Sequence, residues 1–199
     1  MQPWLWIIAG HNGAGKSTLQ PVLATMLGEA CRFLNPDDVT RALLGGTFDV
    51  DNKTRMQANL EAAQWVDRTV DRLIDDGKSV AVETVLSTDK FRRRVLAAKK
   101  AGLAFGFVYI ALSSADLAVR RVETRVKEGG HGVDPNKIRS RRLTSLDQMP
   151  WFAEQADVAF FFCGDTLEPV LIATKTPEHG IEILDALSLP DVTDRLAAL

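Results

Sequence analysis

The chain is 199 residues long, which favours a single domain, and its hydrophobic fraction of 46% is enough to build a sizeable core. Its formal net charge is −2, so there is no global positive field to attract nucleic acid, and nucleic acid is not an expected partner. No apolar run approaches the length of about 18 residues that a membrane span needs, and the first residues lack the charged start of a signal peptide. We therefore expect a cytoplasmic globular protein. Cys31 and Cys163 predict neither a disulfide nor a zinc site.

The most informative segment is Gly10-His11-Asn12-Gly13-Ala14-Gly15-Lys16-Ser17, which fits the P-loop pattern G-x-x-x-x-G-K-[ST]. An apolar run over residues 4–9 precedes it and predicts a buried strand. Apolar residues at helical spacing follow it up to residue 27. Strand, glycine loop and helix form the context in which this pattern binds nucleotide phosphates.

The residue types of the loop suit an anion. Glycines let successive backbone N–H groups point inward, and the following helix start adds partial positive charge. Lys16 is expected to reach the β- and γ-phosphates of ATP, and the Ser17 hydroxyl is expected to hold Mg²⁺. The predicted ATP-binding residues of this segment are Gly10, His11, Asn12, Gly13, Ala14, Gly15, Lys16, Ser17 and Thr18.

Acidic residues follow the second predicted strand, Cys31–Leu34. Asp37 and Asp38 lie one βα unit after the P-loop, where a strand end faces bound phosphates. Either one is also suited to cap the short helix expected over Val39–Leu44. We expect one of them to cap that helix and the other to be catalytic.

A further carboxylate follows the third predicted strand. A long helix is expected over about residues 52–76, with Leu60, Val66 and Val70 among its buried residues, and then the strand 80–82. That strand ends in Glu83-Thr84-Val85-Leu86-Ser87. Carboxyl ends of parallel strands line the ligand crevice, so Glu83 is expected to face a substrate hydroxyl or the Mg²⁺ shell, near Thr84 and Ser87.

Arginines dominate the second half of the chain. Thr88 is expected to cap a helix running to Ala101, on which Arg92-Arg93-Arg94 fan outward, with at least two of them solvated. After the apolar strand 104–112, a helix with Val119, Val122 and Val126 as its buried stripe carries Arg121 and Arg125 on one face and Arg120 elsewhere.

Glycines 129, 130 and 132 then read as a hinge, and the helix expected after Asp134-Pro135 carries Arg139, Arg141 and Arg142. This arrangement predicts a mobile arginine-rich lid over about residues 113–148, whose arginines neutralise phosphoryl charge. A pair of ordinary surface helices is the alternative.

The remaining elements complete an α/β domain spanning residues 1–199. The segment 149–152 is expected to end the lid region, residues 156–163 and 170–174 read as the last strands, and about 190–199 as a short helix. The fold class expected is a P-loop kinase-like parallel sheet flanked by helices.

Motifs of other P-loop proteins are missing. Asn136-Lys137-Ile138-Arg139 lacks the Asp of the N-K-x-D motif for guanine, and neither the paired Asp-Glu strand end of motor ATPases nor L-S-G-G-Q is present. The remaining layout is typical of a small phosphotransferase. In such an enzyme Asp37 would accept the proton of a hydroxyl, and the lid would exclude water.

The sequence resembles the zeta toxin family of P-loop kinases, in particular its short, chromosomally encoded branch. The matching segments run in order across residues 4–174: Ala9–Leu19, Leu34–Asp38, Val82–Ser87, Arg121–Val126 with Gly129-Gly130-His131, and Arg141–Leu146.

The resemblance implies ATP-dependent phosphorylation of a sugar hydroxyl on UDP-N-acetylglucosamine, and it raises an antitoxin as a partner. It also implies roles: Lys16 and Ser17 hold phosphate and Mg²⁺, Asp37 is the base, Glu83 binds substrate and Arg121 bridges phosphates from the lid. Two positions depart from the family pattern. A substrate-contacting Thr is Val85 here, and a second phosphate-binding Arg is replaced by His131.

Two alternatives stay open at this point. The arginine clusters also suit a kinase of nucleic-acid ends. The two departures also suit an ATP-dependent switch or partner-binding module with little transferase activity.

Overall fold

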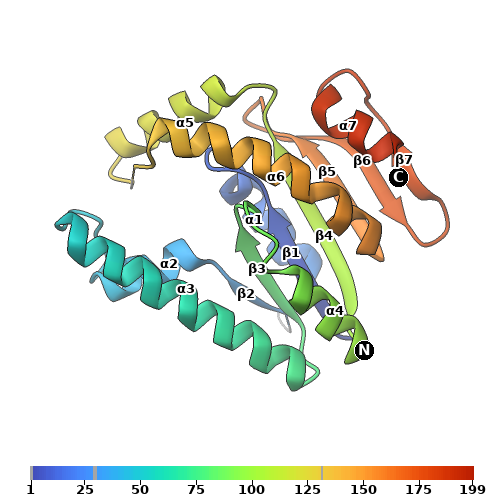
Figure 1. The fold of residues 1–199 in the computed structure, drawn as a ribbon, viewed down its shortest axis with the longest axis horizontal. Coiled ribbons are helices and arrows are strands. Elements are labelled where there is room, and N and C mark those ends of the chain that lie inside the picture. Colours follow the sequence, from blue (N-terminus) through green and yellow to red (C-terminus); the bar gives the residue numbers. More distant parts are fainter. Residues whose placement is uncertain (1, 29–30, 131) are drawn as a thin grey trace.

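The structure is a computed structural model that describes residues 2–28, 31–130 and 132–199. Within these residues, seven strands form one sheet in the order β2-β3-β1-β4-β5-β6-β7 (Figure 1). The first five are parallel, and β6 and β7 are antiparallel to their neighbours. The expected α/β class is confirmed. The strands are β1 Trp4–Ala9, β2 Arg32–Leu34, β3 Val80–Thr84, β4 Ala104–Ala111, β5 Val158–Cys163, β6 Val170–Thr176 and β7 Gly180–Ile183.

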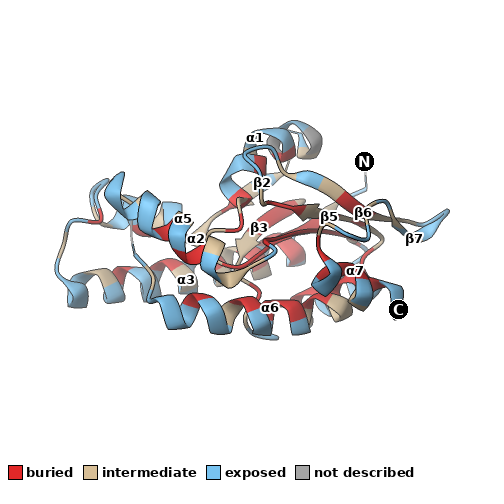
Figure 2. Ribbon diagram, turned by 90° about the horizontal axis from the view of Figure 1, so that it is seen from above, coloured by how far each residue is buried: buried red, intermediate tan, exposed pale blue. Residues whose placement is uncertain are grey.

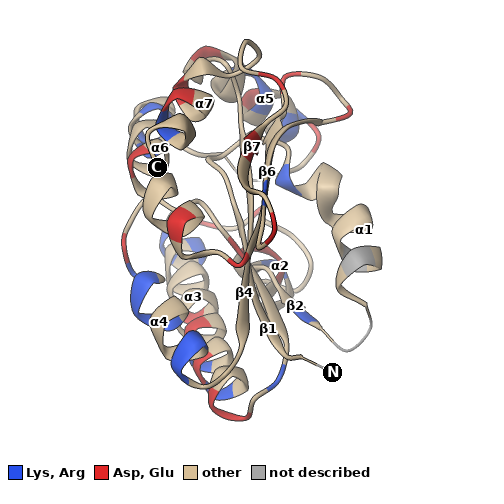
Figure 3. Ribbon diagram, turned by 90° about the vertical axis from the view of Figure 1, so that its right-hand side faces the viewer, with Lys and Arg blue, Asp and Glu red and all other residues tan. Residues whose placement is uncertain are grey.

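Helices cover the two faces of the sheet unequally. Figure 3 shows α1 on one face and α3, α4 and α6 on the opposite face, with α7 beside α6. The helices are α1 Lys16–Leu27, α2 Pro36–Leu43, α3 Asn52–Asp75, α4 Arg92–Lys100, α5 Ala115–Lys127, α6 Pro135–Gln155 and α7 Pro190–Ala197. Edge strand β7 was not predicted, because four residues of an exposed hairpin carry too little hydrophobic pattern.

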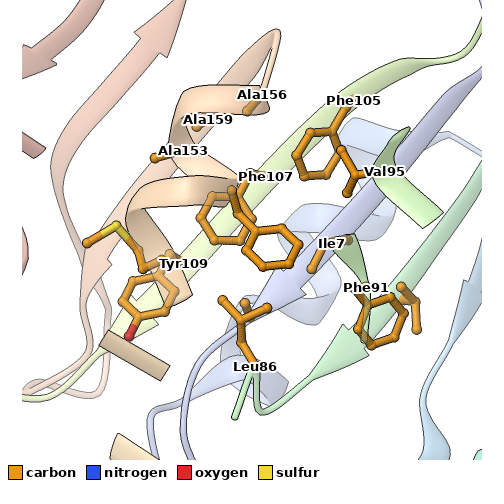
Figure 4. Packing of buried hydrophobic residues seen from close by; sticks show 14 of the residues in the cluster. Ile7, Leu86, Phe91, Val95, Phe105, Phe107, Tyr109, Ala153, Ala156 and Ala159 are labelled. Carbon is orange, nitrogen blue, oxygen red and sulfur yellow. The ribbon is translucent and has the colours of Figure 1, made fainter. Parts of the chain in front are cut away.

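The main core lies between the sheet and the helices α3, α4 and α6, and Figure 2 shows buried residues in the central strands and at intervals along α3 and α6. Figure 4 shows Phe105, Phe107 and Tyr109 of β4 projecting toward this layer beside Ile7. Phe107 stacks on Phe152 of α6 with ring centroids 5.7 Å apart. These aromatic contacts fix α6 against the central strand and so position everything that α6 carries.

Two predicted helix caps are wrong. The side chain of Asn35 caps α2 by accepting a hydrogen bond from the Asp37 backbone N–H at 2.9 Å, so neither Asp37 nor Asp38 is a cap. Pro36 sets the first helical position, which starts α2 earlier than expected. Helix α4 starts only at Arg92 and has no side-chain cap, so Thr88 does not start it.

The segment 149–152 does not end the lid region, because α6 continues through Pro150 to Gln155. The proline removes one backbone hydrogen bond, yet Met149, Phe152 and Ala153 are fully buried beside it and compensate through packing. Helix α6, the second helix of the predicted lid, is therefore anchored in the main core.

Three expected side-chain environments also differ. Leu60 of α3 and Val126 of α5 are exposed, because Leu60 lies on the face of α3 opposite the buried Ala58 and Ala62, and Val126 lies in the last turn of α5. Arg94 is buried rather than solvated, since it pairs with Asp71 at 2.7 Å and with Asp67 at 3.3 Å, and only Arg93 of the three consecutive arginines is exposed.

Among the helices in the described part of the chain, none combines the length and the apolar character needed to cross a membrane.

Candidate active site

The P-loop connects β1 to α1 and is packed tightly on its surroundings. Gly13 and Gly15 have φ values of 80° and 102°, which favour glycine. A Cβ on Gly10 would collide with the Ile110 carbonyl oxygen, and one on Gly13 would lie 2.7 Å from the Ala118 carbonyl oxygen. The loop glycines therefore allow both the turn and the close approach of β4 and α5.

Lys16 is the first residue of α1, and its side chain lies inside the loop. Its Nζ donates to the Gly10 carbonyl at 2.6 Å and lies 3.6 Å from the Glu83 carboxylate. Only 9% of Lys16 is exposed. A buried ammonium at a helix start makes this end of the cleft electropositive, as phosphate binding requires.

His11 is fully buried and does not face the cleft. Its Nδ1 lies 3.0 Å from the Asn12 carbonyl oxygen, and its Nε2 accepts the Leu112 backbone N–H at 3.3 Å. These contacts fit a neutral imidazole with the proton on Nδ1. Burial lowers the pKa of His11 to about 4, and the nearby Lys16 charge contributes. The side chain holds the loop in place and is not placed to contact a nucleotide.

Two side chains, Asn35 and Glu83, connect the ends of β2 and β3. The Asn35 amide donates to the Glu83 carboxylate at 3.2 Å, while its oxygen accepts from the backbone of Asp37. Glu83 in turn lies beside Lys16. Asp37 and Glu83 therefore lie next to the phosphate loop, as expected for residues at the carboxyl ends of parallel strands.

Burial raises the pKa of Glu83, the adjacent Lys16 opposes that rise, and the negative charge of Asp37 adds to it. Asp38 has a smaller influence on the pKa of Glu83 than Asp37 has. Of the two aspartates, Asp37 is thus the one that interacts more strongly with Glu83.

Helix α5 supplies arginines to the loop. The Arg121 Nη2 donates to the Asp165 carbonyl at 2.8 Å, and its Nη1 would lie 3.9 Å from a Cβ placed on Gly15. Arg125 lines the same cleft. So does Arg120, which the helical spacing had placed elsewhere.

Two site residues were missed. Arg141 of α6 donates to the Asn12 side chain of the P-loop at 3.1 Å, and so supplies a further arginine to the phosphate loop. A Cβ on Gly164, just after β5, would collide with the Ala14 carbonyl oxygen of the loop. Arg141 stood out in the sequence only as one of several arginines on its helix, and no local pattern marks Gly164.

One cleft of about 1260 Å³ brings the predicted residues together. Its phosphate end comprises the P-loop with Arg121, Arg125 and Arg141, and its acceptor end comprises Asp37, Glu83, Ser87 and Phe48 with the facing side of α3. His131 lies outside the described residues. The predicted residues that line the cleft are Asn12, Gly13, Ala14, Gly15, Lys16, Ser17, Thr18, Asp37, Glu83, Thr84, Ser87, Arg121 and Arg125.

The donor set suits a Mg²⁺ ion bound with phosphates. Mg²⁺ prefers oxygen ligands and is usually held by one or two protein groups together with phosphate oxygens. The Ser17 hydroxyl stands beside Lys16 at the start of α1, and the carboxylates of Asp37 and Asp38 line the same cleft.

The sequence model of the zeta toxin family matches residues 1–161. The chain belongs to the zeta toxin family. This is a family of P-loop kinases, and the fold and the P-loop geometry agree with that membership. No curated protein matches the chain.

Several solved structures share this fold. The crystal structure of AvrRxo1-ORF1:-ORF2 with ATP has a TM-score of 0.71 and 20% identity, covering 93% of this chain and 61% of that one. The PezAT chromosomal toxin-antitoxin system of Streptococcus pneumoniae has a TM-score of 0.64 and 14% identity, with 99% and 84% covered. The Pnkp1/Rnl/Hen1 RNA repair complex has a TM-score of 0.55 and 16% identity, with 85% and 48% covered.

These TM-scores show a shared fold, and at these low identities they show the fold alone. This chain spans 61% of the length of the AvrRxo1 complex chain that it matches.

Proposed function

We propose that this protein transfers the γ-phosphoryl group of ATP to a hydroxyl of a small molecule. One observation carries the proposal: Lys16 of the P-loop lies 3.6 Å from Glu83, which Asn35 connects to the Asp37 segment. Phosphate-binding and acidic groups thus meet at one point of the cleft. That is where a hydroxyl must stand to attack a phosphorus atom in line.

At the phosphate end, the inward backbone N–H groups and Lys16 hold the β- and γ-phosphates. Ser17 would hold Mg²⁺ together with phosphate oxygens, and the bound ion would supply positive charge next to the phosphates. Arg121 and Arg125 from α5, joined by Arg141 from α6, stabilise the charge of the transferring group. Arg141 fills the place of a second phosphate-binding arginine, whatever the role of His131.

At the acceptor end, Asp37 accepts the proton of the attacking hydroxyl. A new oxygen–phosphorus bond forms while the bond between the β–γ bridging oxygen and the γ-phosphorus breaks, and ADP leaves. Glu83 orients the acceptor through hydrogen bonds, with Thr84 and Ser87 beside it. Asp37 is the better base because its side chain is exposed to the cleft, whereas Glu83 is paired with Lys16.

The domain acts as one kinase unit across residues 1–199, with α5 and the first turns of α6 closing over ATP. Gly129, with φ of 89°, and Gly130 supply the bend between the two helices. Since the later turns of α6 are anchored in the core, closure moves α5 and the first turns of α6 rather than the whole of residues 113–148.

The family resemblance makes a nucleotide sugar such as UDP-N-acetylglucosamine the first acceptor to test. Val85 lines the cleft where the family has a threonine, so the acceptor contacts differ at this point. The PezAT system is a toxin-antitoxin pair. By analogy we propose an antitoxin partner for this chain, testable by growth arrest on expression and its relief by co-expression of a candidate antitoxin.

The deciding experiment measures phosphoryl transfer from ATP, with Mg²⁺, to UDP-sugars, nucleosides and oligonucleotides, with the Lys16→Ala protein alongside. We expect transfer to a UDP-sugar that the substitution abolishes. Transfer to oligonucleotide ends alone, the activity suggested by the RNA repair complex in which a similar fold occurs, would replace the small-molecule proposal. Tight ATP binding with no acceptor-dependent turnover would indicate a switch or partner-binding module instead.

A further inference from the structure

Arg142 of α6 is the least exposed arginine on that helix, with 7% of its surface accessible, and it does not line the cleft. Its guanidinium donates to the Leu112 carbonyl from Nε at 3.3 Å and from Nη2 at 3.1 Å, and from Nη2 to the Ser113 carbonyl at 3.2 Å. Both carbonyls lie just beyond the end of β4, where the sheet no longer pairs them. A buried charge with this many partners holds the chain there in one position.

The C-terminal helix supplies the counter-charge. Asp191, in the first turn of α7, accepts from the Arg142 Nη2 at 2.7 Å, and its carboxylate is about half exposed. Helix α7 lies beyond residue 161, where the match to the family model ends. The contact is thus made by a part of the chain to which the family resemblance gives no role.

The opposite side of the same segment touches the P-loop. The Leu112 N–H donates to Nε2 of His11, the second residue of the loop motif, and both residues are fully buried. The Ser113 N–H donates to the Asp165 carboxylate at 2.9 Å, and the Asp165 carbonyl accepts from Arg121. A displacement of residues 112–113 would therefore reach both the loop and an arginine at the phosphate end.

We propose that Arg142 and Asp191 are positioning residues for nucleotide binding, through which α7 holds residues 112–113 and thereby the P-loop. The inference rests on the proposed function, since it assigns these residues to the ATP site. Neither side chain touches ATP. They act by keeping the Leu112 N–H aimed at His11, which fixes the imidazole and the loop backbone before the phosphates arrive.

A second ion pair between the same helices provides a matched control. Arg195 of α7 lies 3.3 Å from Asp147 of α6, and neither residue contacts residues 112–113 or the P-loop in any described interaction. If α7 only clamps α6, then Asp191→Asn and Asp147→Asn should behave alike. If Asp191 positions the P-loop, only Asp191→Asn should change the ATP site.

The experiment measures the Kd of ATP with Mg²⁺ and the melting temperature of the full chain for both variants. We expect Asp191→Asn to raise the Kd about fivefold, and Asp147→Asn to leave it at the wild-type value even where both melting temperatures fall equally. Asp191→Glu should restore most of the affinity. Equal Kd values for the two Asn variants would overturn the proposal.

Hydrogen exchange of the protein without nucleotide tests the same link independently of ATP. Asp191→Asn should speed exchange of the amides at Leu112 and Ala14, and Asp147→Asn should not. Combining His11→Gln with Asp191→Asn should raise the Kd of ATP by a factor smaller than the product of the two single fold increases. Both substitutions break one connected chain of contacts.

Failure of wild-type protein to bind ATP would remove the proposed function while the exchange result still decides the positioning role. Should Asp191→Asn not fold, Arg142→Lys keeps the charge but loses the Nε contact, and the same exchange comparison applies.

Discussion

The two ends of the cleft are built differently. The phosphate end is fixed by buried groups: Lys16 bonds to loop carbonyls, His11 bonds to Leu112, and the loop glycines sit against β4 and α5. The acceptor end is more open: Asp37, Arg41 and Asn59 are exposed, while Glu83 and Ser87 are half-buried and Phe48 is buried. A rigid phosphate end can serve one nucleotide in many proteins, whereas exposed side chains on α2 and α3 can change with the acceptor. This contrast explains why the nucleotide chemistry is easier to assign than the acceptor.

The largest expected effect is at the phosphate end. Lys16→Ala should lower kcat/KM by about a thousandfold, since it removes the charge that holds the transferring phosphoryl group. The measurement is acceptor-dependent ADP release under steady-state conditions. Lys90→Ala removes an equal charge from the acceptor side of the cleft and should leave the Kd of ATP nearly unchanged. If Lys16→Ala and Lys90→Ala weakened ATP binding to a similar extent, the total positive charge of the cleft would matter for ATP binding and the position of the lysine would not.

The burial of His11 at the phosphate end should also make the free energy of unfolding depend on pH. The folded pKa of His11 is about 4, against an ordinary value of 6.5, so the unfolded chain binds more protons between these values. The free energy of unfolding should therefore fall by about 3 kcal/mol as the pH is lowered from 6.5 to 4. Urea titrations across this range measure it.

His11→Gln is the control for that titration, since it keeps a polar side chain and removes the ionisable group. Its stability should depend less on pH over the same interval. An unchanged slope would mean that the imidazole is not held neutral in the folded protein.

At the acceptor end, Asp37→Asn should reduce kcat by about a hundredfold through loss of the general base, with the Kd of ATP little changed. Asp38→Asn is the matched control on the same helix turn, and its effect on kcat should be several times smaller, because Asp38 interacts less with Glu83. Single-turnover transfer in rapid quench measures both. Full turnover in a folded Asp37→Asn protein would contradict the role of Asp37.

The smallest expected effect concerns the contact between the P-loop and the end of β5. Gly164→Ala places a Cβ against the Ala14 carbonyl oxygen and should raise the Kd of ATP about tenfold by displacing the P-loop. Calorimetric titration with ATP and Mg²⁺ gives the value. Gly77→Ala tests strain alone, because Gly77 has φ of 64° with open space around it, and should reduce stability without changing ATP affinity.

Local chemistry made the P-loop, the acidic strand ends and the order of the elements predictable. Gly10 to Ser17 carry their pattern in consecutive residues, and Asp37 and Glu83 follow apolar runs that had to be strands. The wrong expectations concern competition between neighbours. Asn35, and neither Asp37 nor Asp38, caps α2. Helix α6 continues past Pro150 because Phe152 packs in the core.

The sequence by itself determined the zeta-type P-loop, the α/β class and the identity of the acidic and basic groups, because each depends on residues close together in the chain. The family resemblance singled out Arg121, but only the tertiary structure decided which of the other arginines lie at the site. Arg121 and Arg141 reach the loop, while Arg94 and Arg142 are buried against carboxylates of α3 and α7. Arginines on a helix look alike in sequence. Their roles depend on partners distant in the chain, which become neighbours only when the sheet brings its strand ends together.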